Sequence, residues 1–228
     1  MKLVVINGSP RNKKSNSGLL MDEFLKGFYT IEKEVADIYY LASEKQRIEA
    51  VKAFRENDYI LMIFPLYTDA MPGIVKEFFE KIYGEPGRAG KRIGYIVQSG
   101  FPEAKHSTFL ERYLERFTIK RLKAEYLGTV IKGGVEGIQI MPPRMNAKLF
   151  ASFRKLGEHF AGTGTFSRSI MEKLRKPYTL SAGRLFFFRL MSITGLTNFY
   201  WNSNLRKNKA FDRRFDKPYV VEGLRGES

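Results

Sequence analysis

The sequence predicts an α/β protein built on a doubly wound, five-stranded parallel sheet, followed by a helical, basic and aromatic extension. Five short apolar runs alternate with segments of helical periodicity, which is the pattern of parallel strands joined by helices. The pattern changes after residue 162. With 228 residues and 43% hydrophobic content, the chain can bury one sizeable core and carry an appendage.

The first half of the pattern gives two strands and two helices. Residues 2–7 form the first strand, because an apolar, β-branched run stops abruptly at Gly8. Residues 18–28 follow as a helix with apolar side chains at helical spacing. Residues 35–40 form the second strand. Residues 44–56 form the second helix, with Ile48, Val51 and Phe54 on one stripe.

The second half repeats the alternation three times. Residues 59–64 are almost entirely apolar, as expected for a strand covered on both faces, and residues 72–83 form a helix with proline at its start. Residues 91–98 and 108–121 form the next strand and helix. Residues 124–131 form the fifth strand, which ends before Gly133 and Gly134, and residues 148–160 form the fifth helix.

The loop between the first strand and its helix is rich in hydroxyl, amide and arginine side chains. Backbone N–H groups and the helix dipole at such a junction attract an anion. The predicted phosphate donors are Ser9, Arg11, Ser15, Asn16 and Ser17. The alternative is an ordinary strand–turn–helix junction capped by Asn16 or Ser17. Neither G-x-x-x-x-G-K-[ST] nor G-x-G-x-x-G is present, so the loop suits a phosphomonoester such as the end group of flavin mononucleotide (FMN).

Gly8-Ser9-Pro10-Arg11, followed by Asn16 and Ser17, resembles the phosphate loop of the NAD(P)H-dependent FMN reductase-like flavoproteins of the flavodoxin-like superfamily. The resemblance extends over residues 2–160. It implies the strand order 2-1-3-4-5, FMN at the switch point between strands one and three, and a homodimer with flavin sites near the interface.

Two more loops are expected at the same edge of the sheet, after strands three and four. The second loop, bracketed by prolines, is similar to the family's P-x-Y-x-x-x-x-P segment, and its predicted flavin contacts are Pro65, Leu66, Tyr67 and Thr68. Ser99 and Gly100 are the predicted contacts in the third loop. No catalytic side chain is predicted, because a bound flavin carries the chemistry.

Each of these positions also has a structural alternative. Tyr67 could pack on its own helix, and Ser99 with Gly100 could form a plain turn. Asp69 is expected to cap the following helix. His106 is expected in the first turn of its helix, without a role in proton transfer.

Composition excludes several kinds of site. The chain has no cysteine and two histidines, so no disulfide and no metal site is predicted. The net charge of +15 argues against an acidic electron carrier and suits anionic partners such as NADPH or NADH. The apolar stretch 185–200 is interrupted by Arg189 and is too short to span a membrane, so a cytoplasmic location is expected.

The predicted domains are 1–162, which binds FMN, and 163–228, the extension. The extension contains 13 Lys or Arg against 5 Asp or Glu, with predicted helices at 167–175 and 185–194 and an aromatic, basic segment at 198–216. Its apolar helix is expected to pack on the sheet domain or on a second subunit. An anionic membrane surface is the alternative partner, whereas nucleic acid is disfavoured.

The predicted function is transfer of hydride from NADPH or NADH, through FMN, to a quinone, flavin or other small acceptor. The alternative is a basic interaction protein on the same scaffold, with a degenerate or regulatory flavin site.

Overall fold

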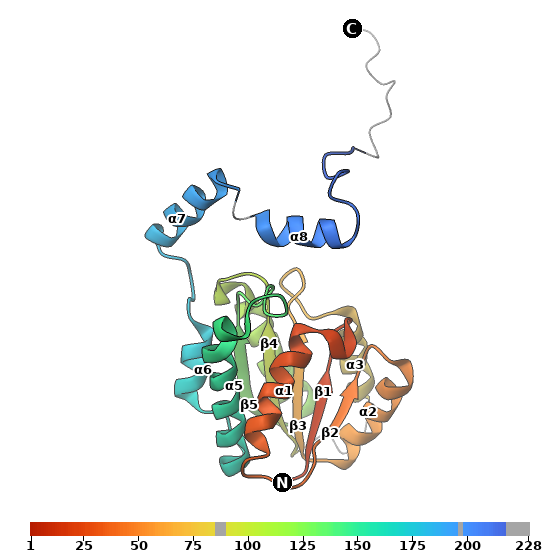
Figure 1. Cartoon of the computed structure of the whole chain (residues 1–228). Coiled ribbons are helices and arrows are strands. Elements are labelled where there is room, and N and C mark those ends of the chain that lie inside the picture. Colours follow the sequence, from red (N-terminus) through yellow and green to blue (C-terminus); the bar gives the residue numbers. More distant parts are fainter. Residues whose placement is uncertain (85–89, 196–197, 218–228) are drawn as a thin grey trace. The chain divides into compact units, whose positions relative to one another are not determined.

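The computed structural model describes residues 1–84, 90–195 and 198–217, and its centre is one parallel sheet (Figure 1). The five strands stand in the order β2-β1-β3-β4-β5, which confirms the predicted fold class and strand order. Every neighbouring pair is parallel. The strands are β1 (Leu3–Asn7), β2 (Asp37–Tyr40), β3 (Tyr59–Pro65), β4 (Arg92–Gln98) and β5 (Glu125–Lys132).

Helices cover both faces of this sheet (Figure 1). On one face lie α1 (Asn16–Phe28) and α5 (Pro143–Thr163), and on the other α2 (Glu44–Glu56), α3 (Gly73–Tyr83) and α4 (Thr108–Arg116). Successive strand residues enter opposite cores, so Val4 and Ile6 pack with the second group while Leu3 and Val5 pack with the first. This two-sided burial explains the unbroken apolar runs of the strands.

The largest differences from the expected helix boundaries are in α5 and α4. Helix α5 begins at Pro143 rather than at residue 148, because proline is well suited to the first helical turn. The helix predicted at 108–121 is divided into α4 and a π-helical turn, η3 (Phe117–Leu122), which Lys123 ends in the left-handed conformation.

The chain forms two compact units, Met1–Thr179 and Leu180–Ser228. Helix α6 (Arg168–Arg175) belongs to the first, where Leu174 is buried and the side chain of Met171 lies beside Gly128 of β5. The predicted boundary at 162/163 therefore falls inside this unit.

The second unit contains α7 (Ala182–Ile193) and α8 (Phe199–Lys207). No residue of α7 is buried. Residues 196–197 and 218–228 of the predicted extension lie outside the described residues. No helix in the described ranges is both long and apolar enough to cross a bilayer.

Candidate functional site

The candidate site lies where the β1–α1 loop meets the loops that follow β3, β4 and β5. In a parallel sheet these loops share the carboxyl edge, and the strand order reverses there between β1 and β3. Three of the four loops are predicted from the sequence. The same edge rule, applied to the fifth strand, would have found the loop 133–142.

The β1–α1 loop is pressed tightly against the first turn of α1. Ser15 is the N-cap: its hydroxyl donates to the Asn12 carbonyl at 2.6 Å and accepts the N–H of Gly18 at 3.0 Å. The cap is therefore not Asn16 or Ser17. A Cβ at Gly18 would lie 2.4 Å from the Lys13 carbonyl oxygen, so only glycine fits here. The first-turn N–H groups of Asn16 and Ser17 have no intrahelical acceptors and can donate to a ligand.

Asn7, the last residue of β1, is a site residue that the sequence reasoning missed. Its side chain is fully buried, and its Oδ1 accepts the N–H of Ser9 at 2.9 Å. Among the residues that the structure describes, its Nδ2 has no hydrogen-bond partner. Leaving a buried donor unsatisfied costs about 1–3 kcal/mol, which a ligand oxygen would recover. The available signal was an amide at the end of an otherwise apolar strand.

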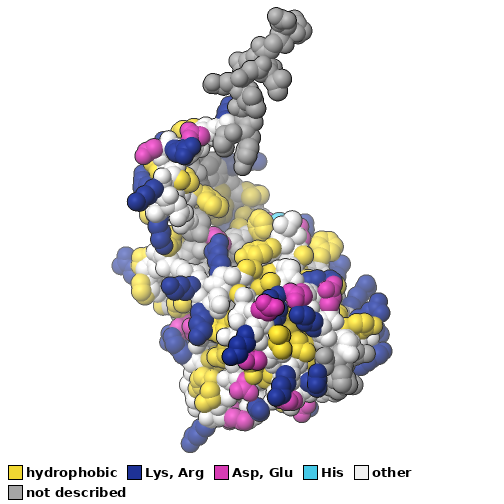
Figure 2. Space-filling model, turned by 90° about the vertical axis from the view of Figure 1, so that its right-hand side faces the viewer, with side chains coloured by type: hydrophobic (Ala, Val, Ile, Leu, Met, Phe, Trp, Pro, Cys, Tyr) yellow, Lys and Arg dark blue, Asp and Glu magenta, His cyan; other side chains and the backbone are white. Residues whose placement is uncertain are grey.

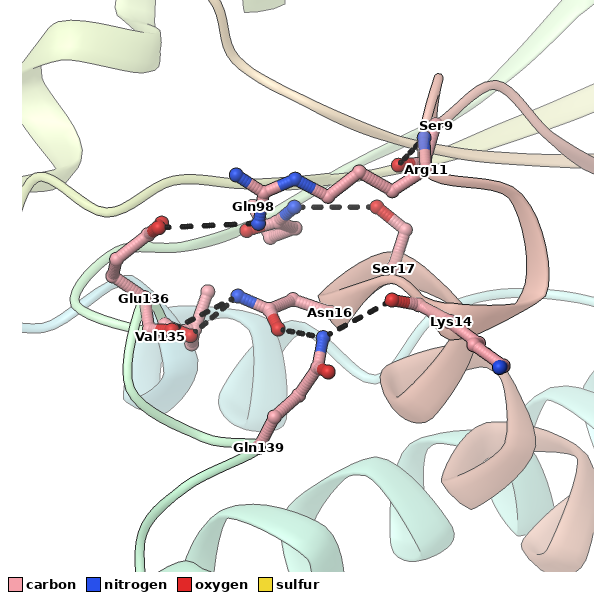
Figure 3. Close-up of polar contacts among 9 residues, drawn as sticks. All are labelled: Ser9, Arg11, Lys14, Asn16, Ser17, Gln98, Val135, Glu136 and Gln139. Carbon is pink, nitrogen blue, oxygen red and sulfur yellow. Dashed lines mark hydrogen bonds and ion pairs between the residues drawn. The ribbon is translucent and has the colours of Figure 1, made fainter. Parts of the chain in front are cut away.

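Asn16 ties the phosphate loop to the loop after β5 (Figure 3). Its Nδ2 donates to the Val135 carbonyl at 2.8 Å, and its Oδ1 accepts from Nε2 of Gln139 at 2.7 Å. Gln139 was also missed, because the fifth loop was not considered. The predicted contact of Asn16 with phosphate therefore falls to its backbone N–H.

Ser17 and Arg11 reach from the β1–α1 segment toward the ends of β4 and β5, Ser17 to Gln98 and Arg11 to Glu136 (Figure 3). Ser17 is fully buried and its Oγ accepts from Nε2 of Gln98 at 3.2 Å, so its own hydroxyl hydrogen is available to a ligand. The Arg11 side chain is 61% exposed and its guanidinium lies 4.0 Å from the Glu136 carboxylate. Arg11 can therefore turn toward an anion in the loop at little cost.

The loop after β3 is a strained two-residue turn. Tyr67 and Ala70 exchange backbone hydrogen bonds of 2.9 and 3.0 Å, and Thr68 and Asp69 between them have φ values of 47° and 63°. Two left-handed residues define a type I′ turn, which is costly for a β-branched side chain such as Thr68. Tyr67 is 44% exposed, so its ring is not packed away against the helix that follows.

The other predicted residues of this loop, Pro65 and Leu66, contact the end of β4 through their backbones. Pro65 ends β3 in register with Gln98, and buried Leu66 donates its N–H to the Gln98 carbonyl at 2.8 Å. Asp69 does not cap α3, whose N-cap is Pro72. Its carboxylate lies instead 3.8 Å from Nδ1 of His106.

The loop after β4 is fixed internally. The Ser99 hydroxyl donates to the Phe101 carbonyl at 3.1 Å and its N–H donates to the Lys132 carbonyl at 3.0 Å. The Ser99 side chain is therefore engaged within its own loop. Gly100 is exposed, and a Cβ there would lie 3.2 Å from a carboxylate oxygen of Glu136.

His106 extends this loop toward the second one. It lies in the short 3-10 helix η2 (Ala104–Ser107), one element before α4, rather than in the first turn of α4. Its ring stacks on Phe101 with centroids 4.6 Å apart, and Nε2 lies 3.6 Å from Glu103. His106 thus links the loop after β4 to Asp69 in the loop after β3.

A second cation borders the edge at the end of β5. Burial lowers the pKa of Lys132 from its ordinary value, since desolvation disfavours the charged amine. A nearby anion would reverse that effect.

Comparisons with known proteins agree with this geometry. The family model of the flavodoxin-like fold (Flavodoxin_2) matches residues 1–159. Among curated proteins, no sequence matches this chain.

Several similar solved structures have TM-scores above one half. An apo NADH:FMN oxidoreductase (EMOB) is 17% identical with a TM-score of 0.54, over 77% of this chain and 96% of its own. The NAD(P)H:quinone oxidoreductase from Methanothermobacter marburgensis is 15% identical. Its TM-score is 0.54, over 69% of this chain and 95% of its own. The FMN-dependent NADH-azoreductase from Bacillus anthracis, in complex with FMN, is 14% identical. Its TM-score is 0.51, over 71% of this chain and 100% of its own.

At these identities the solved structures establish the fold alone. The family model covers more than half of the chain, including every strand and the four-loop edge. By that match, this chain is a member of the flavodoxin-like fold family.

Proposed function

We propose that this protein is an FMN-dependent oxidoreductase that takes hydride from NADH or NADPH and reduces a small acceptor. The observation that carries the proposal is the group of polar donors at the β1–α1 junction. There, an unpartnered buried amide of Asn7, the N-terminus of α1 and the exposed cation of Arg11 come from one short stretch of chain.

The residues present fit a phosphomonoester. The hydroxyls of Ser9 and Ser17 and the N–H groups of Asn16 and Ser17 would donate to its oxygens, with Arg11 supplying charge. Ser15 would hold the helix end in place through its cap, and Asn16 would hold the opposite loop. These donors are suited to a terminal phosphate, the group that distinguishes FMN from riboflavin.

The ring of the flavin would lie along the second and third loops. The half-exposed Tyr67 offers an aromatic face, the turn at Thr68 offers backbone donors, and Gly100 allows close approach of the backbone. When bound, FMN supplies the two-electron chemistry, and the protein binds and orients it. The buried Ser99 and Gln98 would support this surface from behind.

The acceptor is expected to be a quinone, a flavin, an azo compound or a similar small molecule. The names of the similar solved structures, a quinone oxidoreductase and an azoreductase among them, support this class. A homodimer and a cytoplasmic location stay predictions, and light scattering of the purified protein tests the first.

An absorption spectrum tests the proposal directly. A yellow protein, or one that turns yellow with added FMN, should bleach on anaerobic addition of NADPH or NADH. A colourless protein that takes up no FMN would contradict it and would favour the basic interaction protein as the alternative.

An FMN titration tests this group of donors itself. Arg11→Gln removes a charge-assisted contact with phosphate and should weaken binding about 10- to 100-fold. Lys14→Gln, an exposed cation in the same loop, is the matched control and should bind like the parent. Equal affinities for all three would exclude Arg11 from the phosphate site.

A further inference from the structure

The second unit exposes an apolar helix surface that the proposed flavin chemistry does not use. On helix α7 the large apolar side chains are exposed, including Phe186 at 68%, Phe187 at 56%, Leu190 at 51% and Ile193 at 82%. Isolated exposed apolar side chains are normal in proteins, but a contiguous group marks an interaction surface.

Helical geometry gathers these side chains on one face. Phe186, Leu190 and Ile193 stand at positions i, i+4 and i+7, and Phe187 is adjacent. Arg184 lies on the opposite side of the helix, whereas Arg189 borders the group, three residues after Phe186 and four before Ile193. We call the first group the α7 apolar stripe.

The charge around the stripe has a single sign. Residues 180–211 include five Lys or Arg and no Asp or Glu. Residues 212–228 add four Lys or Arg and four Asp or Glu, and Asp216 is paired with Arg213 at 2.8 Å. Figure 2 shows hydrophobic and basic side chains next to one another on this unit.

Helix α8 adds aromatic side chains of the kind that settle at a lipid headgroup layer. Phe199 and Trp201 are 68% and 64% exposed, and Arg206 and Lys207 stand in the last turn. Aromatic rings with cations on the same short helix are typical of segments that lie in a membrane interface.

We propose that α7 and α8 dock on an anionic membrane surface, with the α7 apolar stripe inserted among the lipids and the arginines at the headgroups. At 12 residues α7 is too short to span a bilayer, so it would lie in the interface. Lys and Arg near an anionic leaflet strengthen binding about five-fold each.

A second copy of this chain fits the surface less well. A two-fold interface places a patch against itself, so two surfaces with only positive charge would face each other and repel. Nucleic acid would meet the cations but would leave the aliphatic Leu190 and Ile193 uncovered. An anionic bilayer accommodates both features.

Vesicle binding of the full-length protein tests the inference, with Trp201, the only tryptophan of the chain, as reporter. Vesicles of phosphatidylcholine with phosphatidylglycerol should bind the protein and shift the Trp201 emission to the blue, and salt should weaken the binding. Phosphatidylcholine alone should bind weakly. The readout involves no flavin, so it is independent of the proposed enzyme activity.

Variants at exposed positions locate the contact without threatening the fold. The double variant Phe186→Ser, Leu190→Ser should abolish binding, and Arg184→Gln with Arg189→Gln should weaken it about 25-fold. Phe109→Ser, at a 71% exposed ring in α4, is the matched control and should bind like the parent. Circular dichroism checks that each variant is folded.

Three results would overturn the inference. One is the absence of binding to the anionic vesicles. Another is binding that the α7 variants leave unchanged. The third is a dimer, or a complex with single-stranded DNA, that depends on the stripe while vesicles are not bound.

Discussion

Substituting Gly157 in α5 by alanine tests how closely α1 and α5 must pack. An added Cβ would lie 1.9 Å from the Phe24 carbonyl oxygen and 2.9 Å from the Phe28 nitrogen, whereas ordinary contact begins at 3.4 Å. Both neighbours are backbone atoms of α1, so no side chain can rotate away. The helices must separate by about 1.5 Å, the shortfall in the closer contact.

The cost follows from that displacement. Overpacking a core typically costs about 1–3 kcal/mol, and a clash with rigid backbone belongs at the upper end. Alanine recovers about 1 kcal/mol as a better helix former than glycine. The net loss should be about 2 kcal/mol, which lowers the melting temperature of a chain this long by about 4–8 °C.

The same displacement reaches the candidate site. Helix α1 begins at the β1–α1 loop, and α5 follows the loop after β5. A hydrogen bond of 2.8 Å from the Asn16 amide to the Val135 carbonyl joins these two loops. Moving the two helices apart stretches this bond. We therefore expect Gly157→Ala to lower FMN affinity as well as stability.

Thermal unfolding followed by far-ultraviolet circular dichroism, without FMN, measures the first effect, and FMN titration measures the second. Gly162→Ala is the control, because that glycine is in the same helix with no atom within 4 Å of an added Cβ. It should be stabilised by about 0.5–1 kcal/mol. If Gly157→Ala were as stable as Gly162→Ala, the close approach of α1 and α5 would be refuted.

Three further predictions concern other parts of the first unit. Burial raises the pKa of Tyr126 to about 12, so its contribution to stability is complete below pH 10 and is lost as the pH rises from 10 to 12. Tyr126→Phe should remove up to about 2–3 kcal/mol of that alkaline loss of stability, as measured by denaturant titrations at several pH values. If the free energy of unfolding fell with pH as steeply as in the parent, the raised pKa of Tyr126 would be contradicted. Thr68→Asn should stabilise the FMN-free protein by about 1 kcal/mol, because asparagine tolerates the left-handed conformation, whereas Asp69→Asn should change little. Arg175→Met should lower the free energy of unfolding in urea by about 2 kcal/mol, because it leaves half-buried Glu111 without its bidentate partner. The control is Arg168→Met, at an exposed arginine that pairs with Glu172. A loss for Arg175→Met no larger than that of the control would count against the contact with Glu111.

The sequence predicted the sheet well because the signals are local. The apolar runs, their breaks at Gly8 and Pro65, and the helical spacing between them are properties of neighbouring residues, and the order 2-1-3-4-5 came with the family resemblance. The ends of elements were predicted less well. The π-helical turn after α4 depends on packing that no local pattern reports.

For the candidate site too, the sequence predicted the local features, whereas the contacts between distant residues could not be predicted from it. Its residue types were readable in the β1–α1 loop, since an anion cradle needs hydroxyls, an arginine and a helix start in one stretch of chain. Which of these hydrogen-bond donors are free to bind a ligand could not be predicted from the sequence. The side chain of Asn16 holds the loop after β5, that of Ser99 is engaged within its own loop, and Gln139 joins the site from a distant segment.

The sequence by itself determined the fold class, the polar character of the β1–α1 loop and the basic character of the chain, because hydrophobic periodicity, glycine breaks and charge are properties of individual residues and their neighbours. Only the tertiary structure decided the partners of each polar group. A hydrogen bond such as that from Asn16 to Val135 joins residues 119 positions apart and exists only once α1 and α5 pack together. It also decided that α6 belongs to the sheet unit, since burial depends on what surrounds a helix as well as on its own sequence.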